Sequence, residues 1–175
     1  ILTSAGAGAP PTFATAAAAG ITVADSWRIT SGFNFTTLQT ISTNWERVDT
    51  TGQGTIGSAM TESSGVFTFP STGIYLVVVN IGFSSTTSTR YIETQIDHSS
   101  DSGSNFSYIS RGNTFVNNVA STTFTNASVF SYVDVTNAST ARIRFRVSSD
   151  GTANMPGSSS YNEGQSFLFI RLGDT

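Results

Sequence analysis

The one histidine of the chain, His98, lies in the segment IDHSSDSGSN between Asp97 and Ser99. These are the residue types of a Ser-His-Asp triad, in which the imidazole activates the hydroxyl and the carboxylate orients the imidazole. A triad also needs side chains that converge beside an oxyanion site, and adjacent residues of one segment do not converge in that way. The sequence has no nucleophile elbow, phosphate-binding loop or zinc-ligand spacing. We therefore expect no catalytic residue and no enzymatic activity.

The same segment offers oxygen ligands at every second position, which is one way to surround a calcium ion. These positions are Asp97, Ser99, Asp101, Gly103 and Asn105. The bidentate glutamate that completes a calcium-binding loop is missing at its usual offset. We expect a solvated turn with no metal and no cofactor, and calcium in residues 97–105 stays open as the alternative.

Three arginines alternate with apolar residues near the C-terminal end of the chain. The alternating rows are Arg142, Arg144 and Arg146 against Ile143, Phe145 and Val147. Successive side chains of a strand point to opposite faces, so the three guanidinium groups share one face. That face is either simply solvated or suited to bidentate recognition of an acidic sugar or a phosphate. The three arginines are our candidate ligand-binding residues.

The composition indicates an all-β protein and excludes several classes of partner. Serine and threonine make up 54 of the 175 residues, with 16 glycines, and these types favour strands and turns over helices. The net charge is −3 and lysine is absent, so there is no concentrated basic field for nucleic acid. The longest apolar run is far shorter than the roughly 20 residues of a membrane-spanning helix. We therefore expect no nucleic acid partner and no membrane insertion.

Two segments are apolar on both of their alternating faces, namely residues 74–83 (IYLVVVNIGF) and 166–172 (SFLFIRL). A strand with one face in water alternates apolar and polar residues, whereas a strand covered on both sides does not. With no helix to supply the second cover, either the strands lie centrally in one large barrel or another copy of the chain covers them. We expect a homo-oligomer.

The chain divides into a connector and one domain. Residues 1–25 contain mainly Ala, Gly, Pro and Thr and predict an extended connector. Residues 26–175 form the predicted domain, in which short strands alternate with turns. The strands are expected at 27–34, 44–49, 66–69, 74–83, 91–97, 106–110, 122–124, 128–135, 141–147 and 166–172, with a long loop at 148–160.

Three segments resemble parts of the C1q and tumour-necrosis-factor-like domains. GVFTFPSTGIYLVVV (65–79) resembles the G-x-F-x-x-P-x-x-G-x-Y-x-F segment of that family. EGQSFLFIRL (163–172) is similar to its terminal strand, and SVFSYVDVTNASTARIRFRV (128–147) to a pair of its strands joined by a tight turn. The resemblance implies a ten-stranded jelly roll that assembles as a homotrimer, with one sheet of each subunit facing its neighbours.

Carried over to this chain, the resemblance divides the apolar strand residues between the core and the trimer interface. The core would contain Tyr75, Val77, Val79, Leu168 and Ile170. The trimer interface would contain Leu76, Val78, Phe167 and Phe169, joined by Phe130 and Tyr132.

The connector has a resemblance of its own. ILTSAGAGAPPTF (1–13) resembles a short sequence that precedes the C-terminal domains of bacteriophage tail fibres and related virion appendages. It implies a trimeric knob on a virion, preceded by the rest of the fibre and acting outside the cell on a host surface receptor, a glycan or another envelope component. A structural capsid fibre or decoration knob is the alternative, and a glycan hydrolase is a weaker one.

Overall fold

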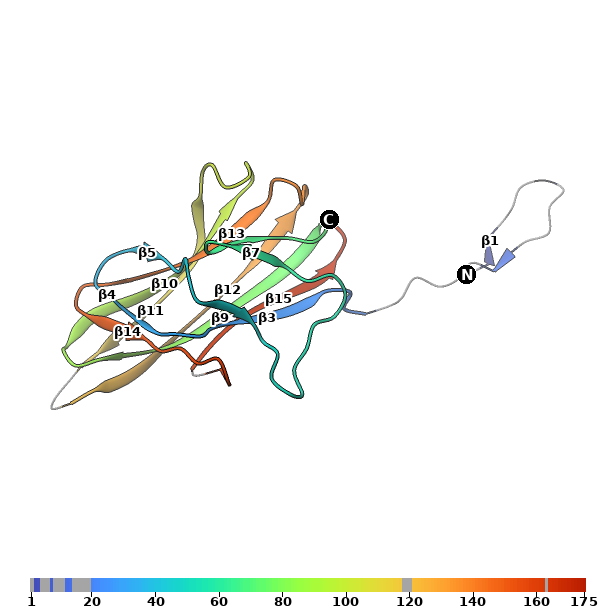
Figure 1. The fold of residues 1–175 in the computed structure, drawn as a ribbon. Helices are drawn as coiled ribbons and strands as arrows, with labels where there is room; N and C mark the ends of the chain where they lie inside the picture. Colours follow the sequence, from blue (N-terminus) through green and yellow to red (C-terminus); the bar gives the residue numbers. More distant parts are fainter. Residues whose placement is uncertain (1, 4–6, 8–11, 14–19, 118–120, 163) are drawn as a thin grey trace.

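The computed structural model describes residues 2–3, 7, 12–13, 20–117, 121–162 and 164–175. Its regular elements are all β-strands, and most of them lie in two antiparallel sheets packed face to face (Figure 1). The all-β prediction is therefore confirmed. No helix in the described part of the chain is long and apolar enough to cross a membrane.

The first sheet is built around two long central strands. Its order is β11 (Ser107–Val116), β10 (Thr89–Ser99), β13 (Arg142–Ser149), β8 (Val66–Thr68) and β7 (Thr61–Ser63), and β5 (Gln39–Thr40) also pairs with β13. The turn between β7 and β8 holds Ser64 at φ 52° and Gly65 at φ 83°. Two positive φ angles in succession belong to the type I′ turn, whose twist matches that of the paired strands.

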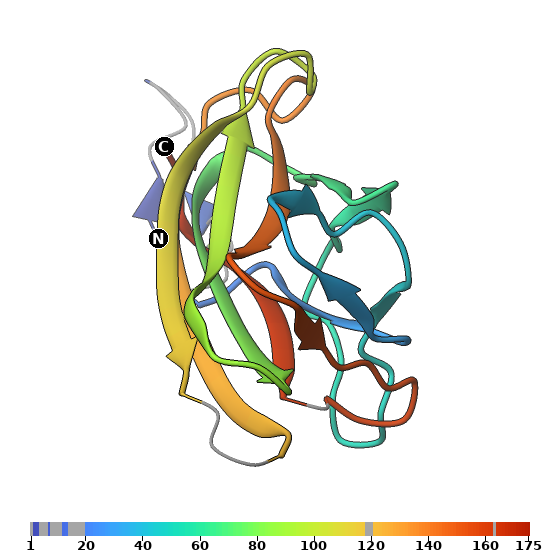
Figure 2. The ribbon, with the colours of Figure 1, turned by 90° about the vertical axis from the view of Figure 1, so that its left-hand side faces the viewer.

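The second sheet is built around β9 (Gly73–Ser85), which is thirteen residues long. Its order is β4 (Phe33–Phe35), β14 (Ala153–Met155), β9, β15 (Gln165–Gly173), β3 (Ala24–Ile29) and β6 (Trp45–Arg47), and β12 (Thr123–Val135) also pairs with β9. β12 and β11 run side by side where the two sheets meet (Figure 2). There the hydroxyl groups of Thr114 and Thr125 share a hydrogen bond, which ties the sheets together at this edge.

Most of the predicted strands are present, with different boundaries. The segments 122–124 and 128–135 form one strand, β12, and the predicted loop at 148–160 contains β14. The sandwich starts at Ala24, two residues before the predicted domain boundary. The predicted connector, 1–25, lies largely outside the described residues, which there include the antiparallel pair β1 (Leu2–Thr3) and β2 (Thr12–Phe13).

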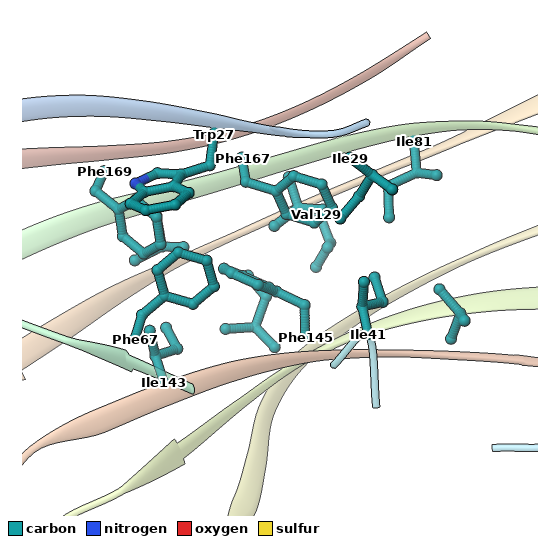
Figure 3. Close-up of a cluster of buried hydrophobic side chains, with 14 of the residues drawn as sticks. Trp27, Ile29, Ile41, Phe67, Ile81, Val129, Ile143, Phe145, Phe167 and Phe169 are labelled. Atoms are coloured by element: carbon teal, nitrogen blue, oxygen red, sulfur yellow. The ribbon is translucent and has the colours of Figure 1, made fainter. Parts of the chain in front are cut away.

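The core between the sheets is centred on aromatic side chains (Figure 3). Phe67 and Phe145 from the first sheet meet Phe167 and Phe169 from the second, with ring centroids 4.9 Å apart for Phe145 and Phe167 and 5.2 Å apart for Phe67 and Phe169. All four side chains have 0% exposure. Ring pairs at such distances add to the hydrophobic burial that holds the sheets together.

The prediction that Phe167 and Phe169 face a neighbouring subunit is wrong, because both lie in this core. Phe167 pairs with Val79 and Phe169 with Val77, and residues opposite each other in two paired strands point to the same side of the sheet. Leu168 and Ile170, predicted in the core, are half-buried on the outer side. For β9 the prediction is correct, since Tyr75, Val77 and Val79 are fully buried.

Candidate functional site

The outer side of the second sheet carries an exposed apolar surface, which we call the apolar face. It consists of Leu76, Val78, Phe130, Tyr132, Leu168 and Ile170. Strand pairing places them side by side, with Val78 between Phe130 and Leu168, and Leu76 between Tyr132 and Ile170. Phe130 and Tyr132 are each 63% exposed. Four of the six predicted interface residues are thus on one surface, and Leu168 and Ile170 take the places of the two phenylalanines.

A contiguous patch of this kind is unusual on the surface of a soluble domain. Single exposed apolar side chains are ordinary, but grouped ones mark contact sites. Each large apolar side chain that becomes fully buried contributes about 1.5–3 kcal/mol. The arrangement can therefore support tight association with a matching apolar surface.

The outer side of the first sheet is formed by β13, β10 and β11 and has a different chemistry. We call it the arginine face, because five of the eight basic residues lie on these three strands: Arg90, Arg111, Arg142, Arg144 and Arg146. The same strands contain two acidic residues, Glu93 and Asp97. Five positive and two negative charges give these strands a net charge of +3, in a chain whose net charge is −3.

Asp97 links two of the three candidate ligand-binding arginines. Its Oδ2 atom accepts a hydrogen bond from Nε of Arg144 at 3.0 Å and another from Nη1 of Arg146 at 3.1 Å. The Asp97 side chain is fully buried, while those of Arg144 and Arg146 are 24% and 22% exposed. A buried carboxylate is stable only with such partners, so these two guanidinium groups serve the fold.

The other contacts of the three candidate arginines also lie within the protomer. Arg142 donates to the backbone carbonyls of Ala138, Ser139 and Ala141. The guanidinium carbon of Arg144 lies 4.1 Å from the centroid of the Phe106 ring. The three arginines share one face as predicted, each makes at least one hydrogen bond within the protomer, and ligand binding by them stays a prediction.

The segment that suggested a triad or calcium is organised differently. Asp97 and His98 point to opposite sides of β10, and Asp97 bonds to arginines. Burial lowers the pKa of His98 below its usual value of 6.5. Hydrogen bonds from the Ser99 hydroxyl and from Asn105 lower the pKa of Asp101 to about 2. Among the described residues, no three or more His, Asp or Glu side chains group together to hold a metal.

An open groove with a volume of about 660 Å³ runs along the arginine face, mainly over β10 and β11. Its lining includes Arg90, Tyr91, Glu93, Arg111, Asn113 and Phe115. Glu93 and Asn113 are paired residues of the two strands, so their side chains lie on the same face. This groove was not among the predicted sites, although residues 91 and 93, and residues 111, 113 and 115, alternate so that each row shares one face of its strand.

Known proteins resemble this chain in structure and not in sequence. No family model matches the sequence, and no curated protein does. Among solved structures, Eiger TNF from S. frugiperda superposes with a TM-score of 0.67 at 12% identity, covering 87% of this chain and 94% of that one. Murine APRIL superposes with a TM-score of 0.59 at 11% identity, covering 86% and 98%. The chain has the jelly-roll fold of the tumour necrosis factors.

The TNF-like fold agrees with the resemblance of the 65–79 segment. Gly65 closes the β7–β8 hairpin, and a Cβ atom there would lie 2.3 Å from the carbonyl oxygen of Ile41, so a side chain has no room. Tyr75 is fully buried, and its hydroxyl bonds to Ser71 in the turn before β9. The positions of Gly65 and Tyr75 in this segment are thus explained by backbone geometry and packing. At this level of identity, the comparisons establish the fold alone.

Proposed function

We propose that the domain is a homotrimeric adhesion knob, the terminal part of a phage tail fibre or related virion appendage, which binds a receptor on the host cell surface. The observation that carries the proposal is the apolar face on a TNF-like jelly roll. Three copies of this face, turned toward a common three-fold axis, would cover each other's Phe130, Tyr132, Leu76 and Val78. Such an interface resembles a divided core, as in obligate oligomers.

The position of the apolar face fits this assembly. The two sheets pack face to face, so their outer sides point in opposite directions. A trimer built on the outer side of the second sheet leaves the arginine face of each subunit directed outward. Three identical weak sites that engage a repetitive surface together bind it about 10²–10⁴ times more tightly than one site. Adhesion is therefore the function that trimerisation would serve best.

The placement of the carboxylates favours adhesion over hydrolysis. A glycoside hydrolase needs two carboxyl groups facing each other across the substrate. Here Asp97 is held by two arginines, and Asp25 accepts hydrogen bonds from Trp27, Arg47 and the backbone of Met60. Glu46 and Asp49 are bound to Arg28. We propose a binding protein without enzymatic activity, located on the virion and acting outside the cell.

Adsorption of the parent virion to its host cells tests this function. The isolated trimer is expected to block adsorption. The same domain with Leu76→Asp and Leu168→Asp, compared at equal protomer concentration, is expected to block it at least tenfold less well, because it would bind through single sites. If the intact trimer does not compete, the domain has a structural role, such as a decoration knob. Release of reducing sugar from the host envelope would instead indicate a hydrolase.

A further inference from the structure

We propose that the groove on the arginine face binds a saccharide that carries a carboxylate, with Arg111 as the residue that recognises the acid. This inference rests on the proposed adhesive function and names the ligand class. The groove, about 660 Å³ in volume, lies within the range of about 300–1,000 Å³ that is usual for small-ligand sites. It accommodates a few sugar rings and is open at the surface, as a site for part of a longer glycan must be.

Two aromatic rings line the groove and are accessible from solvent. Phe115 is 65% exposed and Tyr91 is 39% exposed. Neither side chain belongs to the core, so their exposure is not explained by packing between the sheets. The face of an aromatic ring is electron-rich and attracts the C–H bonds of a sugar, which gives rings of this kind a role as stacking platforms.

Polar side chains line the groove together with these rings. Glu93 accepts hydrogen bonds from Gln95 and Arg111, and Asn113 is its partner on β11. A carboxylate accepts hydrogen bonds and an amide both donates and accepts them, as the hydroxyl groups of a sugar require. A groove with exposed aromatics and such groups has the chemistry for a saccharide and lacks the apolar enclosure for a lipid.

Arg111 gives the groove its preference for an acid. Its ion pair with Glu93 is long, with 3.3 Å between Nη1 and Oε2, and its side chain is 53% exposed. The guanidinium group also lies 5.6 Å from the Tyr108 ring centroid, which holds it over the strand. Arginine binds carboxylates through two parallel hydrogen bonds, and the remaining donors of Arg111 are available for that geometry. Arg144 and Arg146 are also paired with a carboxylate, that of Asp97, but their side chains are only 24% and 22% exposed.

Binding of a defined oligosaccharide tests the inference. The probe is a hyaluronan hexasaccharide, which carries glucuronate carboxylates, and the neutral control is a chitin hexasaccharide of equal length. Titration of the ¹⁵N-labelled trimer, observed by NMR, is expected to shift the amide signals of β10 and β11 with the acidic probe. Raising the salt concentration is expected to weaken this binding, because exposed charges are screened.

Two matched pairs of variants locate the site. Arg111→Gln is expected to reduce affinity for the acidic probe about tenfold, the usual effect of losing one charge-assisted contact. Arg171→Gln, on β15 of the second sheet and outside the groove, is expected to leave it unchanged. Phe115→Ala is expected to weaken binding, and Tyr161→Ala, an exposed aromatic elsewhere, is not. Unfolding curves confirm that each variant is folded.

Equal binding of both hexasaccharides, or equal loss in Arg111→Gln and Arg171→Gln, would overturn the inference. The same holds if neither hexasaccharide shifts the β10 and β11 signals. Its failure is distinguishable from failure of the adhesive function. If the trimer blocks virion adsorption but binds no acidic saccharide, the adhesive function stands and the saccharide site is refuted. If the trimer binds the saccharide in the groove but does not block adsorption, the site stands and the adhesive function is refuted.

Discussion

The two outer faces of the sandwich are built from the same kind of strand but satisfy their side chains in different ways. On the arginine face, the charged groups find partners inside the protomer, as Asp97 does with Arg144 and Arg146. On the apolar face, Phe130 and Tyr132 are each 63% exposed. Charges that are paired at the surface are stable next to water, whereas a contiguous apolar patch gains free energy only when something covers it. The comparison indicates which face assembles and which remains open to a ligand.

The largest expected effect is on assembly. Leu76→Asp combined with Leu168→Asp places two carboxylates in the centre of the apolar face, where burial against a neighbour would leave them unpaired. We expect the trimer to dissociate to monomers that keep their β-sheet circular dichroism, with the mass measured by light scattering. Phe130→Ser with Tyr132→Ser, at two exposed positions, is expected to have the same effect with less risk to the fold.

The matched control for this variant lies on the other face. Val66→Asp introduces the same charge on β8 at a half-buried position that pairs with Arg144. It is expected to leave the oligomer intact. A stable trimer in both apolar-face variants, or dissociation by Val66→Asp, would reverse the assignment of the two faces.

The next largest effect is expected at Asp97. Asp97→Asn removes the negative charge that Arg144 and Arg146 share. Breaking a fully buried ion pair costs about 3–5 kcal/mol, and partial exposure of these arginines reduces the cost here to about 2 kcal/mol. Urea unfolding at fixed protein concentration, followed by tryptophan fluorescence, measures the loss. Asp150→Asn, which removes the partner of the exposed Arg90, should change the unfolding curve little. Equal curves for Asp97→Asn and the parent chain would contradict internal pairing.

The smallest effect is expected from His98, which lies on the inner side of β10 beneath the arginine face. Its pKa is lowered by burial, so the unfolded state binds a proton first as the pH falls below about 6.5. Stability is therefore lost as the pH falls through and below about 6.5, and His98→Gln should lose less as the pH falls. Asp101 stays ionised throughout, because its pKa is about 2. An identical pH dependence of the unfolding free energy in both proteins would show that His98 is not the titrating group.

The sequence pattern correctly predicted the fold class. For one of the two strands that are apolar on both faces, it also correctly predicted which row of side chains faces the core. In β9, Asn80 interrupts one row, and the other row, which includes Tyr75, Val77 and Val79, is the core. In β15 the rows Phe167 and Phe169 against Leu168 and Ile170 are equally apolar, so hydrophobicity could not decide between them. The register of the hydrogen bonds between β15 and β9 determines which row faces the core. A register shift of one residue would move every side chain of β15 to the opposite side of the sheet.

The charged face shows a second limit of sequence analysis. The common face of Arg142, Arg144 and Arg146 follows from the two-residue period of a strand. Their partner Asp97 is 47 residues away from Arg144 in sequence, so only the pairing of β10 with β13 reveals it. To predict the groove, one would also need to know how β10 pairs with β11, and this pairing includes two register shifts. Long-range pairing, rather than local pattern, determines which residues form a site.

The mass of the unmodified domain in solution tests the central claim most directly. Light scattering coupled to size-exclusion chromatography, at micromolar protomer concentration, is expected to give three times the chain mass of 18.4 kDa. A trimer of that mass is the result expected if copies of the chain cover the apolar face, and its dissociation by the apolar-face variants assigns the face. A stable monomer of 18.4 kDa would contradict the account, because Phe130 and Tyr132 would then remain exposed to water without a partner.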